Sequence, residues 1–256
     1  MTITWLHGLF GHRGDFDAVQ RRLTSPGRSI HLALPGHDGA AALAPGDGPG
    51  FDEAVASLWS ALDAQGVEET ALVGYSMGAR LAMHMALAAP RRVSRLVCVG
   101  GHPGLEDAAA RAERLEVDRA RADRLRTLGL SDFLAAWYAQ PLFQDFRASA
   151  GFPEHLARRS QGDAAAIATS LERLSTGHQS PLGEAMVRCP VPTLWVAGAR
   201  DLRYRELLAP LGATQTSGRY AEVEGAGHAA HLEAPEALAE AIDLLLNGSS
   251  AQGSAR

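Results

Sequence analysis

The stretch Gly74-Tyr75-Ser76-Met77-Gly78 constrains this chain more than any other. It matches the pattern G-x-S-x-G, follows the apolar run 70–74 and opens the helical pattern 76–89. In that context the glycines permit a sharp turn that lifts the serine hydroxyl clear of a sheet. The pattern therefore predicts that Ser76 is a catalytic serine. The alternative is a Gly/Ser-rich turn without chemistry.

Short apolar runs of the kind found in buried parallel strands recur along the chain. They lie at 3–7, 29–34, 70–74, 93–100, 193–198 and 220–225. Helix-like segments follow several of these runs, at 15–23, 51–66, 76–89 and 235–248. This alternation predicts an α/β fold with a mostly parallel sheet and helices on both faces.

The alternation stops between residues 103 and 188. That stretch is rich in Ala, Arg, Leu and Glu, and it contains several helical patterns but no strand-like run. We therefore expect an all-helical cap inserted between the fourth and fifth strands. The expected division is a core of 1–102 and 189–247, a cap of 103–188 and a disordered tail of 248–256.

Composition excludes several classes of function. The formal net charge is −5, so a nucleic-acid partner is not expected. No window approaches the roughly 20 apolar residues of a membrane span, and no signal peptide is seen, so a cytoplasmic location is expected. Cys98 and Cys189 do not make a disulfide framework, which fits a reducing compartment. No metal-binding or phosphate-binding motif stands out, so neither a metal nor a cofactor is expected.

A catalytic serine needs a histidine as its base and a carboxylate that orients the histidine. In an α/β-hydrolase the order along the chain is Ser, Asp, His. Asp201 follows the fifth apolar run and His228 follows the sixth, so both would reach the carboxyl edge of the sheet near Ser76. We predict these three as the triad, although Asp201 could instead cap the next helix. His231 is expected to be a surface or cap residue.

An oxyanion hole needs two backbone N–H donors. One is expected from Met77, the residue after the serine. The other is expected from the loop after the first strand, LHGLFG at 6–11, where Leu9 follows His7-Gly8. The alternative for this loop is an ordinary tight turn.

Together these motifs resemble those of one family in the α/β-hydrolase superfamily, the 2-succinyl-6-hydroxy-2,4-cyclohexadiene-1-carboxylate synthases of menaquinone biosynthesis. The G-x-S-x-G and G-x-G-H patterns are common to the superfamily, whereas two cap motifs are more specific. The stretches that carry the resemblance are LHGLFGHRGDF, LPGHDG, GYSMGAR, GGHPGL followed by RAER, AAWYAQPLF, GARDLRYREL and GAGHAAHLEAPE.

The resemblance implies an α/β-hydrolase fold with a helical cap and a reaction that is not hydrolysis. Pyruvate would be eliminated from 2-succinyl-5-enolpyruvyl-6-hydroxy-3-cyclohexene-1-carboxylate after proton abstraction next to the succinyl carbonyl. Ser76 would act as the base, backed by His228 and Asp201, and the oxyanion hole would hold the charge on the carbonyl oxygen. Met1 lies almost at the first strand, so the antiparallel hairpin that often opens this fold is expected to be reduced or missing.

The implied substrate carries three carboxylates, so its pocket should hold several cations. Arginine suits this task because its planar fork can meet a carboxylate with two hydrogen bonds. Arg80 lies four residues after Ser76 and projects from about the same helix face. A buried guanidinium at that position must meet a carboxylate of the protein or of a ligand. The resemblance implies further pocket residues: Tyr75, Arg114, Trp137, Arg159 (or its neighbour Arg158) and Arg203.

Each of these pocket residues has an ordinary structural alternative. The cap arginines could be solvated charges, Arg203 a surface loop residue and Trp137 part of the cap core. Two other functions also stay open, namely a serine-dependent hydrolase of esters or C–C bonds and a binding protein on a hydrolase fold. A related polyacid could be the substrate. The oligomeric state is not given by the sequence, although a monomer is compatible with it.

Overall fold

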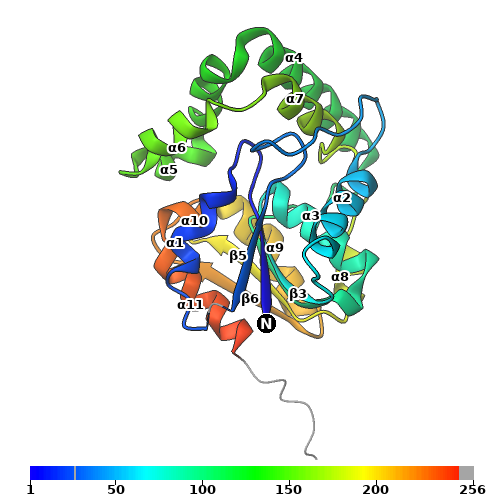
Figure 1. Ribbon diagram of the computed structural model, residues 1–256, viewed down its shortest axis with the longest axis vertical. Coiled ribbons are helices and arrows are strands. Elements are labelled where there is room, and N and C mark those ends of the chain that lie inside the picture. The colour runs from blue at the N-terminus through cyan, green and yellow to red at the C-terminus, as the bar shows by residue number, and fades with distance from the viewer. Residues whose placement is uncertain (26, 248–256) are drawn as a thin grey trace, which may run out of the picture.

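The computed structural model describes residues 1–25 and 27–247, so the predicted disordered tail at 248–256 lies outside the described residues. Six strands form one sheet in the order β2-β1-β3-β4-β5-β6 (Figure 1). Every neighbouring pair is parallel. The predicted strands are confirmed as β1 (Thr2–Leu6), β2 (Arg28–Leu32), β3 (Thr70–Tyr75), β4 (Val93–Val99), β5 (Thr193–Gly198) and β6 (Gly218–Val223). No strand pair within the described residues is antiparallel.

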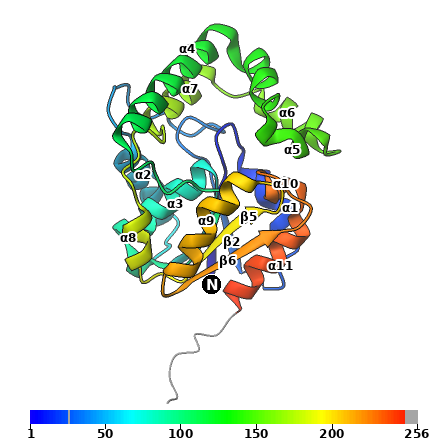
Figure 2. The same cartoon turned by 180° about the vertical axis from the view of Figure 1, so that it is seen from behind.

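The strands are apolar on both sides because both faces of the sheet are covered. In β3, Val73 packs on one face and Leu72 on the other. The short helix η1 (Arg13–Phe16), α1 (Asp17–Gln20), α10 (Ala230–Glu233) and α11 (Pro235–Leu246) cover the first face, as Figure 2 shows from behind. The second face is covered by α2 (Phe51–Asp63), α3 (Met77–Ala88), α8 (Gly183–Arg188) and α9 (Leu202–Thr214).

The helix expected at 15–23 is shorter than its pattern suggests. A 3₁₀ turn, η1, comes first, and α1 then adds a single turn. The side chain of Asp15 accepts a hydrogen bond from the N–H of His12, while the His12 ring accepts one from Gly14, so a capping box fixes the tight turn. This geometry leaves the Asp15 carboxylate inside the molecule, where it contacts the cap.

The segment between β4 and β5 is helical and arches over the carboxyl ends of the strands (Figure 1). The longest helix, α4, breaks at Gly129, which has a φ of 74°. Asp107 caps the start of α4, and Asp163 caps α7. The helices of this arch are α4 (Ala108–Tyr138), η3 (Pro141–Phe143), α5 (Gln144–Ala148), α6 (Phe152–Arg159) and α7 (Ala164–Arg173).

The last helix of the predicted cap, α8, packs against α3 and α9 of the core. Because α8 contacts the core, the boundary of the cap at residue 188 stays a prediction, as does the division into a core and a cap of 103–188. A short turn, η2 (Pro90–Arg92), joins α3 to β4. None of the helices in the described part of the chain is long and apolar enough to cross a membrane.

Candidate active site

Ser76 sits on a strained turn between β3 and α3. Its φ of 50° and ψ of −108° lie outside the regions that side chains favour, which is typical of functional turns. A Cβ atom at Gly78 would lie 2.2 Å from the carbonyl oxygen of Leu6, and one at Gly74 would lie 2.5 Å from that of Gly78. The two glycines are therefore needed for the helix to pack this closely on the sheet. The turn places Ser76 at the carboxyl edge.

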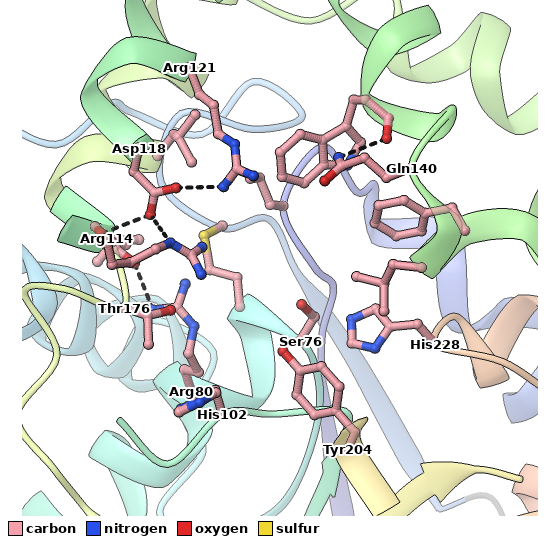
Figure 3. A pocket seen from close by; sticks show the side chains of 18 of the residues that line it. Ser76, Arg80, His102, Arg114, Asp118, Arg121, Gln140, Thr176, Tyr204 and His228 are labelled. Carbon is pink, nitrogen blue, oxygen red and sulfur yellow. Dashed lines mark hydrogen bonds and ion pairs between the residues drawn. The ribbon is translucent and has the colours of Figure 1, made fainter. Parts of the chain in front are cut away.

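His228 and Asp201 form a buried pair at the same edge. Nδ1 of His228 lies 2.7 Å from Oδ2 of Asp201. The other carboxylate oxygen of Asp201 accepts a hydrogen bond from the N–H of Tyr204 at 3.3 Å, so Asp201 both caps α9 and binds the histidine. Glu233 accepts from the N–H of Ala229 and thereby holds the loop of His228. Figure 3 shows the His228 ring facing Ser76.

Two buried histidines hold the loop after β1. Nδ1 of His7 lies 2.8 Å from the carbonyl oxygen of Gly8, and its Nε2 accepts the N–H of Leu34 at 3.1 Å. Nε2 of His37 accepts the N–H of Phe10 at 3.1 Å. Burial lowers the pKa of both rings, that of His37 to about 3, so both are neutral and can accept these bonds.

The predicted oxyanion donors border the same cavity as Ser76. Leu9 and Met77 both line it. Because His37 takes the N–H of Phe10, the N–H of Leu9 is the donor that this turn leaves open, and it has no partner among residues 1–25 and 27–247. Met77 is the first residue of α3, so the helix offers its N–H no carbonyl. This arrangement fits a hole for a negatively charged oxygen.

The cavity that Ser76 and His228 both line, called the main cavity below, has a volume of about 150 Å³ and is strongly cationic. Ser76 and His228 lie at its base, on the core side (Figure 3). Among the described residues that line it, Asp118 is the one with a carboxylate. The arginines that line it are Arg80, Arg114, Arg121 and Arg203. Such a cavity favours a ligand that carries several negative charges.

Arg80 is buried without a carboxylate among the described residues. Its Nη1 donates to the carbonyl oxygen of Leu174 at 2.6 Å and lies 3.4 Å from Oε1 of Gln179. Burial and the nearby Arg114 lower the pKa of Arg80 to about 10, so it is still charged at neutral pH. Its neutral partners satisfy part of the guanidinium but do not balance its charge. A ligand anion would do so.

Asp118 holds two of the cavity's arginines. Its buried carboxylate accepts from Nε of Arg114 at 2.7 Å and from Nη1 of Arg121 at 3.0 Å. Ser175 adds a third hydrogen bond at 2.8 Å. Arg114 is therefore not merely a solvated charge, and Figure 3 shows its guanidinium turned toward the cavity. Sequence reasoning missed Arg121 and Asp118, although 114, 118 and 121 share one helical face.

Arg159 does not line the main cavity. It lines a second, smaller one of about 30 Å³, together with Tyr75, and Ser76 borders both. Nη2 of Arg159 donates to Asp15 at 2.6 Å, while its Nε and Nη1 have no partner among the described residues. Burial alone would lower the pKa of Arg159, but Tyr138 and Asp15 raise it overall. A second anion could therefore bind beside Ser76.

Arg158 points elsewhere. It also donates to Asp15, at 3.2 Å, and it lines an outer groove together with Arg159. Unlike Arg159, it lines neither of the two cavities that Ser76 borders. The structure therefore favours Arg159 over Arg158 as the cap arginine near the serine.

The remaining predicted pocket residues each line at least one of the two cavities. Trp137 lines both, and the guanidinium carbon of Arg121 lies 5.4 Å from the centre of its ring. The ring of Tyr75 lies 5.3 Å from that of His228. Arg203 is largely exposed, yet it lines the main cavity.

His231 was expected at the surface or in a cap, and this expectation is wrong. The residue is fully buried, and its ring lies 4.1 Å from that of Tyr75. The reason is that α10 packs against η1, α1, α5 and α11, so this short helix is enclosed. Sequence reasoning also gave no role to His102, which lines the main cavity. Burial and then Arg203 lower the pKa of His102 to about 4, so it is neutral.

Comparison with known proteins places these features in a family. The sequence model of the "Alpha/beta hydrolase family" matches residues 5–241. The 2-succinyl-6-hydroxy-2,4-cyclohexadiene-1-carboxylate synthase of Serratia proteamaculans is 36% identical over 248 residues, which cover 96% of this chain and 93% of the relative. The protein of the same name from Salmonella schwarzengrund is 33% identical over 245 residues, with the same coverage.

Solved structures agree with the sequence comparison. MenH from S. aureus has a TM-score of 0.89 and is 25% identical, over 96% of this chain and 93% of the other. An enol-lactonase from Burkholderia xenovorans has a TM-score of 0.80 at 18% identity, over 96% and 91%, and shows the fold alone. The chain is therefore an enzyme of the α/β-hydrolase fold and belongs to the family of 2-succinyl-6-hydroxy-2,4-cyclohexadiene-1-carboxylate synthases.

Proposed function

We propose that this enzyme eliminates pyruvate from 2-succinyl-5-enolpyruvyl-6-hydroxy-3-cyclohexene-1-carboxylate. The other product is 2-succinyl-6-hydroxy-2,4-cyclohexadiene-1-carboxylate. The curated relatives of this chain take their names from that product. The reaction would be a carbon–oxygen lyase step without a cofactor.

The observation that carries the proposal is the set of arginines around Ser76. A substrate with three carboxylates needs several cations, and each carboxylate–arginine pair gains from charge-assisted hydrogen bonds. Arg80 and Arg114 reach the main cavity from core and cap, and Arg159 approaches Ser76 through the second cavity. A hydrolase of simple esters would have no need for this charge.

The proton would be removed by Ser76, which passes its own proton to His228. Nε2 of His228 accepts it, and the Asp201 carboxylate at Nδ1 stabilises the imidazolium that forms. The electron pair of the C–H bond moves into the succinyl carbonyl as an enolate. The N–H groups of Leu9 and Met77 would donate to that oxygen. Collapse of the enolate shifts the ring double bond and breaks the C–O bond to the enolpyruvyl group.

The test is to supply the enolpyruvyl substrate and to follow both pyruvate release and the absorbance of the conjugated diene. We expect the two signals to rise together. No turnover of this substrate, combined with fast hydrolysis of aryl esters, would instead favour a serine hydrolase. Ser76→Ala should lose most of the turnover, and the unmodified enzyme should form no covalent adduct with its own substrate, because the serine acts as a base.

A further inference from the structure

Tyr204 connects the two buried residues of the proposed triad. Its backbone N–H donates to Asp201, and its ring centre lies 4.6 Å from that of His228. The edge of a second histidine ring, that of His102, approaches it at 6.5 Å between centres. These contacts pack the ring of Tyr204 against two histidine rings in the cavity wall.

The hydroxyl of Tyr204 is open to the main cavity. Tyr204 lines that cavity with Ser76 and His228, and Figure 3 shows its oxygen directed toward Ser76. Throughout the described ranges, 1–25 and 27–247, no group is hydrogen-bonded to this oxygen. Tyrosine hydroxyls inside proteins usually have a partner. The Tyr204 hydroxyl is not closed off by the protein and borders the cavity, so a substrate bound there can supply this partner.

We propose that Tyr204 is a further catalytic residue, the proton donor to the oxygen of the leaving enolpyruvyl group. The inference rests on the proposed elimination, in which the C–H bond breaks at ring carbon 2 and the C–O bond at ring carbon 5. These two carbons face each other across one six-membered ring. An acid for this reaction must therefore lie in the same cavity as the base. Tyr204 and Ser76 line one cavity, and Figure 3 shows the Tyr204 hydroxyl directed toward Ser76.

The step balances in protons and electrons. The C–H electron pair becomes part of the new diene, and the C–O electron pair goes to the leaving oxygen, which takes the proton of Tyr204. The leaving group departs as the enol of pyruvate and turns into the keto form in water. The proton taken from carbon 2 rests on His228. Its transfer to the tyrosinate restores both residues, so the enzyme gains and loses no proton overall.

The surroundings of the hydroxyl suit this role. Burial raises the pKa of Tyr204, so the group carries its proton at neutral pH. Arg203 and Arg80 act in the opposite direction and favour the tyrosinate. They would stabilise the negative charge that develops on the phenol oxygen while the proton is being transferred.

The direct test is Tyr204→Phe, which keeps the ring against His228 and removes only the hydroxyl. We expect kcat to fall by roughly 10²–10⁴-fold, the usual contribution of a positioned acid, with KM and the melting temperature nearly unchanged. Tyr220→Phe is the matched control, because that hydroxyl bonds Glu222 on β6 at 3.1 Å and does not line the cavity. It should leave turnover unchanged.

A second measurement separates proton donation from support of the ring. The chain has four tyrosines, and all can be replaced by the more acidic 3-fluorotyrosine. In the plot of kcat against pH, the decline at alkaline pH should then move to lower pH in the chain that keeps residue 204 as a tyrosine. It should not move in Tyr204→Phe. An active enzyme in which Tyr204→Phe has normal kcat, or in which the alkaline decline does not move, overturns the assignment. Failure of the unmodified enzyme to release pyruvate would count against the proposed elimination instead.

Discussion

Arg80 donates a 2.6 Å hydrogen bond to the carbonyl oxygen of Leu174, so its buried charge rests on a neutral partner. Unbalanced buried charges are costly, and proteins keep them mainly where a ligand supplies the counter-charge. The same carbonyl belongs to the segment after α7, whose next residue, Ser175, bonds Asp118. The core arginine and the cap arginines are thus held in place by one segment of the protein itself.

Replacement of Arg80 by Gln should weaken the enzyme through substrate binding. The amide can still donate to Leu174, so the fold should survive, but the charge is lost. We expect kcat/KM to fall roughly 30-fold or more, mainly through a higher KM. This corresponds to a loss of about 2 kcal/mol of transition-state stabilisation. The measurement is the rate of pyruvate release against substrate concentration. Unchanged kinetics in a folded variant would rule out a carboxylate contact at Arg80.

Replacement of Asp201 by Asn should greatly reduce turnover but leave the affinity for the substrate nearly unchanged. The amide can still accept from the N–H of Tyr204, so α9 keeps its cap, but it cannot stabilise a charged His228 ring. We expect kcat to fall by about 10²–10⁴-fold with little change in KM. Single-turnover rates would check this. A loss confined to KM would show that the carboxylate acts on binding and not on proton transfer.

Arg121 and Arg119 offer a matched pair on α4. Each bonds an acidic residue three positions earlier, Arg121 to Asp118 and Arg119 to Glu116, but only Arg121 lines the cavity. We therefore expect Arg121→Gln to raise KM by about fivefold, since a partly exposed charge-assisted contact contributes of the order of 1 kcal/mol. Arg119→Gln should leave KM unchanged. Equal effects of the two substitutions would mean that Arg121 acts only through the general charge of the cap.

The sheet and the serine turn could be predicted because their signals are local. An apolar run of strand length is followed by Gly74 and Gly78. Two glycines at this spacing indicate a helix that packs closely on its strand. The residues that were missed depend on contacts between distant segments. Asp118 and Ser175 meet across the cap, and Tyr204 meets His228 across two loops, so no spacing in the sequence reports these pairs. Arg121 was missed for another reason. The helix α4 carries many arginines, and the sequence alone does not show which of them faces the cavity.

The misplaced histidine, His231, leads to a prediction about acid stability. Both of its ring nitrogens are buried without a partner among the described residues, between the rings of Tyr75 and Phe16. Burial lowers its pKa to about 3 from an ordinary 6.5, and Arg159, His155 and His228 act in the same direction while Asp15 opposes them. Between these pH values the unfolded chain binds a proton here that the folded chain does not.

Stability must therefore fall as the pH falls from 6.5 toward 3. His231→Phe keeps an aromatic ring in the same place and removes the titrating group. At pH 7 we expect the variant to unfold with a free energy equal to or slightly above that of the unmodified protein. At pH 4.5 the free energy of unfolding of the variant should exceed that of the unmodified protein by about 2.5 kcal/mol more than at pH 7, since each pH unit below 6.5 contributes about 1.4 kcal/mol. Urea unfolding at the two pH values measures this difference. An equal difference at both would show that His231 is not kept neutral by its burial, because only a group that protonates more readily in the unfolded chain can make the comparison depend on pH.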